Sequence, residues 1–195
     1  AFRATKAECL DLPETTEIVR TVELELQAQK LYQQLVRDSY TRIKEGEITA
    51  ANVLTRLLRL SQLTGGFLRG DETDRVERVS TAKLDALSDI VDSAAQEGGK
   101  LVIIARFLPE INAITRMLES KSIVFSLITG AVKDRDEQVQ RFQTDPDVTV
   151  FVGQIATAGL GITLTATDKM VFYSLDYSMS NFEQTKARIH RVGQR

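Results

Sequence analysis

The spacing of apolar residues divides the chain into two unlike halves. Over residues 24–43 apolar side chains recur every three or four positions, which predicts an amphipathic helix that ends at Gly46. A second helix is predicted from Ala51 to the Gly65–Gly66 pair, and the polar stretch RGDETDRVERV (69–79) after it predicts a mobile loop. The residues expected to face inward on the second helix are Val53, Leu54, Leu57, Leu58 and Leu60. Residues 1–79 therefore form a mostly helical extension.

From residue 80 the pattern alternates between short apolar runs and helical periodicity. The apolar runs at 101–105, 123–128, 148–152 and 170–175 predict strands buried on both faces, as in a parallel sheet. The intervening segments predict helices, with caps expected at Ser80 or Thr81, at Asp134 with Glu137, and at Ser180 with Glu183. The fold class is α/β, with a RecA-like lobe over 80–195, and ligands are expected beyond the carboxyl ends of its strands.

Charge, cysteine content and the length of apolar runs limit the kinds of binding partner and cellular location to be expected. The net charge is −2, so binding of a polyanion needs a local basic patch. The single cysteine, Cys9, excludes an intrachain disulfide, and no apolar run approaches the roughly 20 residues that span a bilayer. No signal peptide is visible, so a cytoplasmic location is expected, or a nuclear one in a eukaryote. The chain starts at Ala and stops just after a motif, which suggests an excised fragment.

The closing stretch QTKARIHRVGQR gathers basic side chains and the only histidine. On a helix that begins near Ser180 and ends near Gly193, Gln184, Arg188 and Arg191 lie on one face. Two guanidinium groups on one face favour an anion between them, such as the phosphates of a nucleotide. A solvated basic helix end that complements the helix dipole remains the alternative.

The stretch GQIATAGLGITLTA places Gly159 and Gly161 in one connection. Glycines there let the backbone approach phosphate groups closely, although plain turn residues are the alternative. A dinucleotide fingerprint is excluded because its third glycine would fall on Leu164. A nucleophile elbow is excluded because no serine lies between the glycines.

These motifs resemble those of the Swi/Snf family of ATP-driven DNA translocases. The closing stretch matches the family pattern Q-x-x-x-R-x-H-R-[IV]-G-Q, and the connection matches A-G-x-G-[LI]-[NT]-L. The resemblance implies that Arg188 and Arg191 are arginine fingers that stabilise charge on the transferring phosphoryl group. For His190 a structural role is expected on other grounds, because nothing nearby in sequence suggests a nucleophile or an orienting residue for a catalytic base. The residues implied to lie near the nucleotide are Gln184, Gly159, Gly161 and Thr163.

The same resemblance implies contacts with the DNA backbone. KLVIIARF matches the first motif of the family's second lobe, and LITGAVKDRDEQVQRFQ matches T-G-x(4)-R-x(3)-[VI]-x-x-F. The implied DNA contacts are Arg106, Thr129, Gly130, Gln154 and Thr157. Two positions depart from the family pattern: Ala187 stands where Asp is frequent, and Gln154 where Ser or Thr is frequent. The resemblance covers nearly the whole chain and leans toward a bacterial or phage-type branch near the annealing helicases.

The sequence lacks the other half of a nucleotide site. No G-x-x-x-x-G-K-[ST] pattern occurs, and EGGKL at 97–101 precedes a strand where a P-loop precedes a helix. The resemblance therefore implies that ATP and Mg²⁺ are held mainly by a separate first lobe, with no metal ligands on this chain. The expected partners are that lobe and double-stranded DNA read without sequence preference, and no membrane. The family sheet also continues with a further strand, whose absence would leave an unpaired edge. We expect the chain alone to hydrolyse no ATP. Two alternatives remain: a lobe of a strand-separating helicase, and a non-catalytic module that binds nucleic acid or protein.

Overall fold

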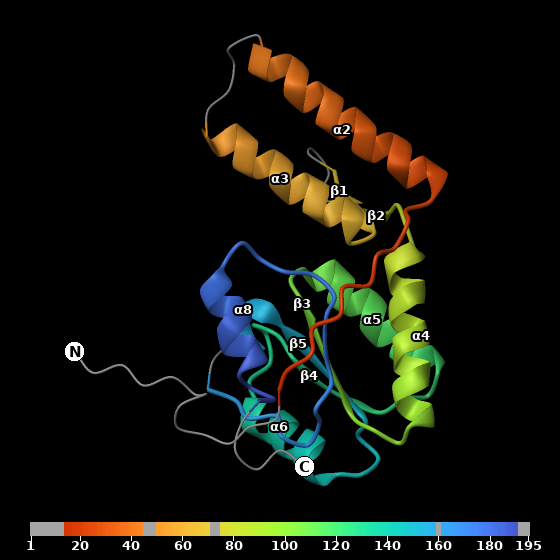
Figure 1. The fold of residues 1–195 in the computed structure, drawn as a ribbon, viewed down its shortest axis with the longest axis vertical. Coiled ribbons are helices and arrows are strands. Elements are labelled where there is room, and N and C mark those ends of the chain that lie inside the picture. Colours follow the sequence, from red (N-terminus) through yellow and green to blue (C-terminus); the bar gives the residue numbers. More distant parts are fainter. Residues whose placement is uncertain (1–13, 45–49, 71–74, 159–160, 191–195) are drawn as a thin grey trace, which may run out of the picture.

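Two stacked parts make up the molecule, as seen in the computed structural model, which describes residues 14–44, 50–70, 75–158 and 161–190 (Figure 1). The larger part is a parallel sheet in the order β4-β5-β3-β6. Its strands are β3 (Leu101–Ala105), β4 (Phe125–Ile128), β5 (Val150–Gln154) and β6 (Met170–Phe172). Its helices are α4 (Ala82–Gln96), α5 (Leu108–Ser120), α6 (Arg135–Thr144), α7 (Ile155–Ala158) and α8 (Met179–Lys186). The predicted α/β lobe is thus confirmed.

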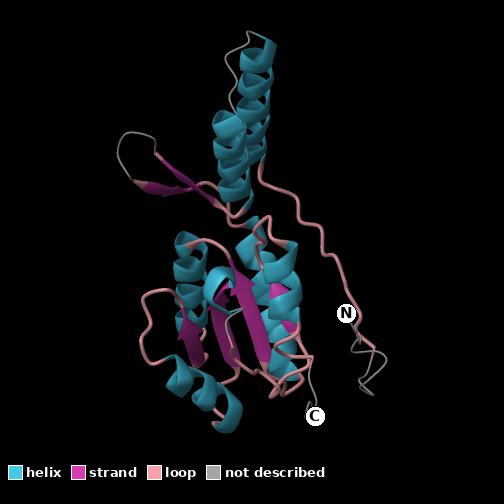
Figure 2. Ribbon diagram, turned by 90° about the vertical axis from the view of Figure 1, so that its left-hand side faces the viewer, coloured by secondary structure: helices cyan, strands magenta, loops and turns pink. Residues whose placement is uncertain are grey.

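Successive residues of the central strands feed two separate cores. Leu101 and Ile103 of β3 pack with α4 and α5 on one face, while Val102 and Ile104 pack with α6 and α7 on the other. Because side chains alternate across a strand, an all-apolar strand is stable only when both faces are covered. Figure 2 shows helices on both sides of the sheet, as the apolar strands predicted.

The predicted helix caps are confirmed only in part. Asp134 is the N-cap residue of α6, as predicted, but its side chain makes no cap bond, and its carboxylate accepts from Gln138 Nε2 at 2.9 Å. Helix α8 is capped by Ser178, whose Oγ accepts from the backbone N–H of Asn181, so Ser180 is not its cap. Ser180 instead accepts a bond from Gln184 Nε2 at 3.0 Å. The competing Ser residues lie two positions apart, and only the local backbone selects between them.

The extension consists of α2 (Leu26–Lys44), α3 (Ala50–Thr64) and an antiparallel hairpin of β1 (Phe67–Arg69) and β2 (Val76–Arg78). In Figure 2 the hairpin projects sideways from the base of the two helices. The hairpin corrects the prediction of a loop over 69–79. The predicted inward face of α3 is also wrong in part, since Val53, Leu54 and Leu57 are exposed. Two paired helices have no further layer to cover that face.

A remote carboxylate caps α4. Thr81, the N-cap residue, makes no side-chain cap bond of its own. Instead the Glu25 carboxylate accepts from the backbone N–H groups of Thr81 at 2.8 Å and Ala82 at 3.1 Å, and from the Ser80 hydroxyl. These hydrogen bonds, that of Ser80 first, lower the pKa of Glu25 from 4.5 to about 2. The predicted cap at Ser80 is confirmed in part, since its Oγ accepts from the Ala82 N–H at 3.3 Å, but a carboxylate 55 residues away in sequence adds further bonds.

Residues 14–25 run along the lobe in an extended conformation before α2 begins (Figure 1). Glu17 pairs with Lys186 at the end of α8, and Arg20 lies 3.6 Å from Asp89 of α4. Tyr177, on the loop before α8, contacts α3 through its hydroxyl, which lies 3.0 Å from Ser61 Oγ. The extension is thus tied to the lobe at several places. The boundary at residues 79 and 80 remains a prediction.

Lys100 closes the end of α6. Its Nζ donates to the carbonyl oxygens of Phe142 and Asp145, each at 2.6 Å. We expect Lys100→Met, which keeps the aliphatic stem, to lower the free energy of unfolding by about 2 kcal/mol, because two partly buried carbonyls lose a charged donor. Urea denaturation measures this, with the exposed Lys133→Met as the control. Equal stability of the two variants would show that the contacts contribute nothing.

Candidate functional site at the carboxyl edge of the sheet

Three predicted DNA contacts meet at the carboxyl edge of the sheet. Arg106 follows β3, Gly130 follows β4 after one residue, and Gln154 ends β5, which lies between those two strands. The Gln154 amide joins them: its Oε1 accepts from the Gly130 N–H at 3.3 Å, and its Nε2 donates to the Arg106 carbonyl at 3.4 Å. Gln154, the departure from the family pattern, therefore connects neighbouring loops.

The two threonines of this group differ in accessibility. Thr157 lies on α7, half-buried, and its hydroxyl donates to the Gln154 carbonyl at 3.0 Å. Thr129 is only 7% exposed, whereas Gly130 beside it is exposed. In this state the backbone N–H of Gly130 is bound to Gln154. A phosphate on this edge would therefore meet Gly130 before Thr129.

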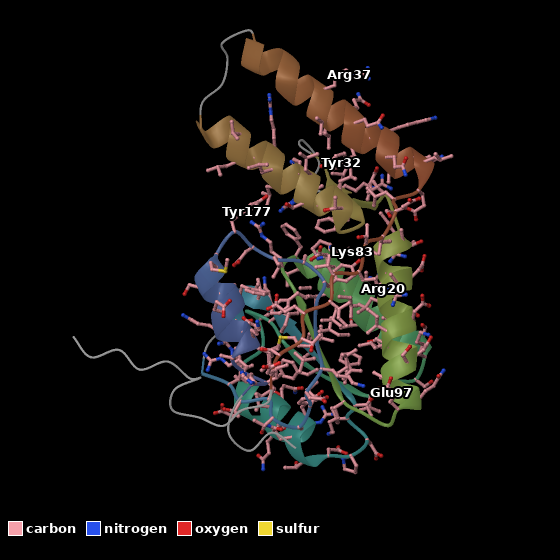
Figure 3. All side chains as sticks on the ribbon, viewed as in Figure 1. Arg20, Tyr32, Arg37, Lys83, Glu97 and Tyr177 are labelled. Atoms are coloured by element: carbon pink, nitrogen blue, oxygen red, sulfur yellow. The ribbon has the colours of Figure 1, made fainter. Side chains whose placement is uncertain are left out.

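The Arg106 guanidinium lies between two aromatic rings. Its Cζ is 4.9 Å from the ring centre of Phe107 and 5.1 Å from that of Tyr177. Cation–π contact of this kind restrains a long side chain. Arg106 Nη1 is buried and has no hydrogen-bond partner in the part of the chain that the structure describes. Tyr177, labelled in Figure 3, reaches this position from the loop before α8.

A buried carboxylate holds the backbone beneath Arg106. Glu110 of α5 is 1% exposed and accepts hydrogen bonds from the Phe107 N–H at 3.1 Å and from the Ser174 hydroxyl. Ser174 Oγ in turn accepts from the Arg106 N–H at 2.7 Å. Lys83, shown in Figure 3, belongs to the first turn of α4 and contributes positive charge nearby. The loop after β3 is therefore fixed by a network that spans three elements.

Burial makes Glu110 sensitive to pH. Desolvation raises its pKa above 4.5, although the bonds from Ser174 and Phe107 and the charge of Lys83 oppose the change. A raised folded-state pKa favours folding below pH 4.5, and that contribution is lost as pH rises through the raised value. We expect Glu110→Gln to remove this loss, so the stability of the variant relative to wild type should increase as pH rises above 4.5. Urea denaturation across this range tests it.

The control for Glu110→Gln is Glu137→Gln, which removes an exposed carboxylate of α6 outside this network. A stability difference between wild type and Glu110→Gln that stays constant with pH would contradict the expectation.

The predicted nucleotide contacts make up a second group, on the glycine-rich connection and at α8. Gly161 is exposed and has a φ of +72°, and an added Cβ there would meet nothing within 4 Å. The Leu164 N–H donates to the Arg188 carbonyl at 2.9 Å, which joins the glycine-rich connection to the end of α8. Gln143 of α6 anchors the same connection, because its Nε2 donates to the Thr163 carbonyl and its Oε1 accepts from Ala166 N–H, both at 2.8 Å.

The closing helix is shorter than predicted. Helix α8 ends at Lys186, and Arg188 lies in the turn that follows. The prediction that Gln184 and Arg188 share one face of a continuous helix is therefore wrong, because the chain turns to bury Ile189 (7% exposed) in the core. Gln184 is exposed and Arg188 half-buried. Two predicted residues, Gly159 and Arg191, lie outside the described residues, as does Gly193, the predicted helix end.

Sequence reasoning missed the residues that hold the site together. Glu110, Ser174 and Gln143 all bond to the backbone next to predicted contacts. For Glu110 a signal existed: it stands three positions after Phe107, behind Pro109, where a capping carboxylate belongs. Nothing in the sequence singled out Ser174 or Gln143.

Two general findings concern the described residues alone. Within these ranges no group of three His, Cys, Asp or Glu side chains is placed to hold a metal ion. None of the helices that the structure describes has the length and apolar character needed to cross a membrane.

Residues 82–193 match a protein family described as the helicase conserved C-terminal domain. Helicase SWR1 of Eremothecium gossypii is 32% identical over 114 residues, 57% of this chain and 8% of that protein. The ATP-dependent helicase MG018 of Mycoplasma genitalium is 27% identical over 197 residues, 99% of this chain and 19% of that protein. The chain thus spans less than a fifth of either relative.

A solved structure shares the fold. The Sulfolobus solfataricus SWI2/SNF2 ATPase core, determined in complex with double-stranded DNA, superposes with a TM-score of 0.69 over 89% of this chain and 37% of that one. The sequence identity is 23%, so the likeness concerns the fold.

Proposed function

The chain belongs to the family of helicase conserved C-terminal domains, and from this premise we propose that it is the second RecA-like lobe of an ATP-driven translocase on double-stranded DNA. The observation that carries the proposal is the meeting of Arg106, Gly130 and Gln154 at one edge of the sheet, joined by the Gln154 amide. These residues come from three separate sequence motifs, and they lie together at or just after the ends of three strands.

On this proposal the carboxyl edge binds the phosphate backbone. Arg106 supplies a guanidinium already restrained by two rings, and the exposed Gly130 supplies a backbone N–H that exchanges its bond to Gln154 for one to phosphate. Thr129, Gln154 and Thr157 complete the proposed contact. Phosphate contacts carry no base information, so binding is independent of sequence and weakens steeply with salt.

The second group faces the nucleotide. Gly161 leaves open space beside the backbone, which suits a close approach of phosphate or ribose. Thr163 lies on the same connection, and Gln184 lies on α8. Gly159 and Arg191 are assigned to this group from the motifs alone. Arg188 and Arg191 supply positive charge that stabilises the negative charge on the terminal phosphoryl group of ATP as that group is transferred. The phosphate cradle and the Mg²⁺ ligands are assigned to the first lobe of the longer protein, because this sequence has no P-loop pattern.

The proposal is tested with the chain alone and with the longer protein that contains it. We expect no ATP turnover by the chain alone, and DNA-stimulated turnover when the first lobe is present. The chain should bind duplexes of two unrelated sequences with equal affinity, and Arg106→Ala should weaken both alike. Strand displacement by the longer protein would favour a strand-separating helicase. Robust turnover by the chain alone, or sequence-specific binding, would contradict the proposal.

A further inference from the structure

A hollow of about 300 Å³ lies between the β1–β2 hairpin and the lobe, beside the first turn of α5. Its walls come from β2, α4 and α5, and Tyr173, which follows β6 and is 4% exposed, also lines it. The residues that give it its chemistry are Arg78, Leu84, Asn112, Ala113 and Arg116. The proposed ATP and DNA contacts take no part in it.

The hairpin is held firmly against the lobe. Gly66 accepts hydrogen bonds from the Val79 N–H at 2.9 Å and the Ser80 N–H at 3.3 Å. The rings of Phe67 and Phe107 meet edge to face, 5.5 Å apart, and the Tyr173 hydroxyl donates to the Gly65 carbonyl at 3.3 Å. The hollow is therefore formed before any ligand arrives, which lowers the entropic cost of binding.

Two arginines line the hollow, and neither has an anionic partner among the described residues. Arg78 on β2 and Arg116 on α5 are both exposed, and within the described residues neither makes a hydrogen bond or an ion pair. The lining also includes the half-buried apolar side chains of Leu84 and Ala113, beside the polar Asn112. Guanidinium groups bind carboxylates in a fork geometry, and the apolar surface accepts an aliphatic or aromatic side chain.

We propose that this hollow docks an acidic peptide segment of a partner protein, which inserts an apolar side chain and places carboxylates on Arg78 and Arg116. A DNA backbone fits less well, because it presents phosphates along a broad surface and has no apolar side chain to place against Leu84 and Ala113. Two arginines beside a partly apolar lining match a peptide in which acidic and large apolar residues alternate.

The test measures fluorescence anisotropy of a short dye-labelled peptide that alternates Asp or Glu with Phe, titrated with the 195-residue chain. Saturable binding is expected, and Arg78→Glu and Arg116→Glu should each weaken it about tenfold or more. Ala113→Phe, which fills the hollow without changing charge, should weaken it as well. Lys30→Glu, on exposed α2, makes the same change in charge outside the hollow and should leave binding unaltered.

Three results would overturn the proposal: no binding of the peptide, binding that none of the hollow variants weakens, or equal binding of a peptide with Lys in place of its acidic residues. Parallel titrations use a DNA duplex and inorganic phosphate. If binding of the duplex or of phosphate depends on Arg78 and Arg116 while binding of the peptide does not, the hollow is an anion site of another kind and the proposal fails. Circular dichroism of each variant establishes that the fold is retained.

Discussion

Arg188→Ala is expected to lower the DNA-stimulated ATPase rate of the longer protein by about a thousandfold, the loss typical of an arginine finger. The backbone of this residue is held independently of its side chain, because its carbonyl accepts from Leu164 and the next residue, Ile189, is buried. Removing the guanidinium should therefore leave the fold and the loop unchanged. Steady-state ATPase assays with saturating duplex measure the effect.

Arg188→Lys is the informative companion variant. Lysine keeps the charge but lacks the planar fork, so it should restore only a small part of the rate. The dissociation constant for duplex DNA and the melting temperature should stay at wild-type values for both variants. An Arg188→Ala enzyme within tenfold of the wild-type rate would remove Arg188 from the catalytic role.

Gly66→Ala is expected to lower the free energy of unfolding by about 3 kcal/mol. Gly66 has a φ of +96°, which is costly for any residue with a Cβ, and an added Cβ would lie 2.6 Å from the Ser80 carbonyl oxygen. That oxygen belongs to the backbone and cannot move without displacing the start of α4. The hairpin should therefore detach in part, and denaturant titration measures the loss.

Gly98→Ala separates the two causes of this loss. Gly98 also has a positive φ, +68°, but a Cβ there would meet nothing within 4 Å. This variant should lower the free energy of unfolding only through the unfavourable backbone conformation, by about 1 kcal/mol. Equal losses at Gly66 and Gly98 would show that close packing against Ser80 contributes nothing.

The confirmed predictions are those with a strong pattern behind them. The strand centred on Ile103 is apolar at every position, and the helices between the strands have clear periodicity, so the RecA-like sheet and its two helical faces were predictable. The helicase family and the Swi/Snf-type fold followed from the long closing motif and were confirmed by the comparisons. The lean toward a bacterial or phage-type branch and the cytoplasmic location remain predictions.

The errors have a common origin in contacts between distant residues. Sequence placed the cap of α4 on Ser80 or Thr81 and missed the distant Glu25, which accepts from the backbone N–H groups of both Thr81 and Ala82. Sequence continued the closing helix to Gly193, but α8 ends at Lys186 and Ile189 turns into the core. A helical spacing of side chains shows what one helix could present, and it does not show where the helix ends.

By itself, the sequence determined the alternation of strands and helices in the lobe, the apolar character that buries the sheet on both faces, and the identity of the motif residues. These depend on side chains close together in sequence, whose pattern is legible without a structure. The tertiary structure alone decided that Gln154 joins Arg106 to Gly130, that Glu110 is buried beneath them, and that the hairpin and lobe enclose a hollow. Such contacts arise between segments far apart in sequence, and their geometry is set only when the whole sheet packs.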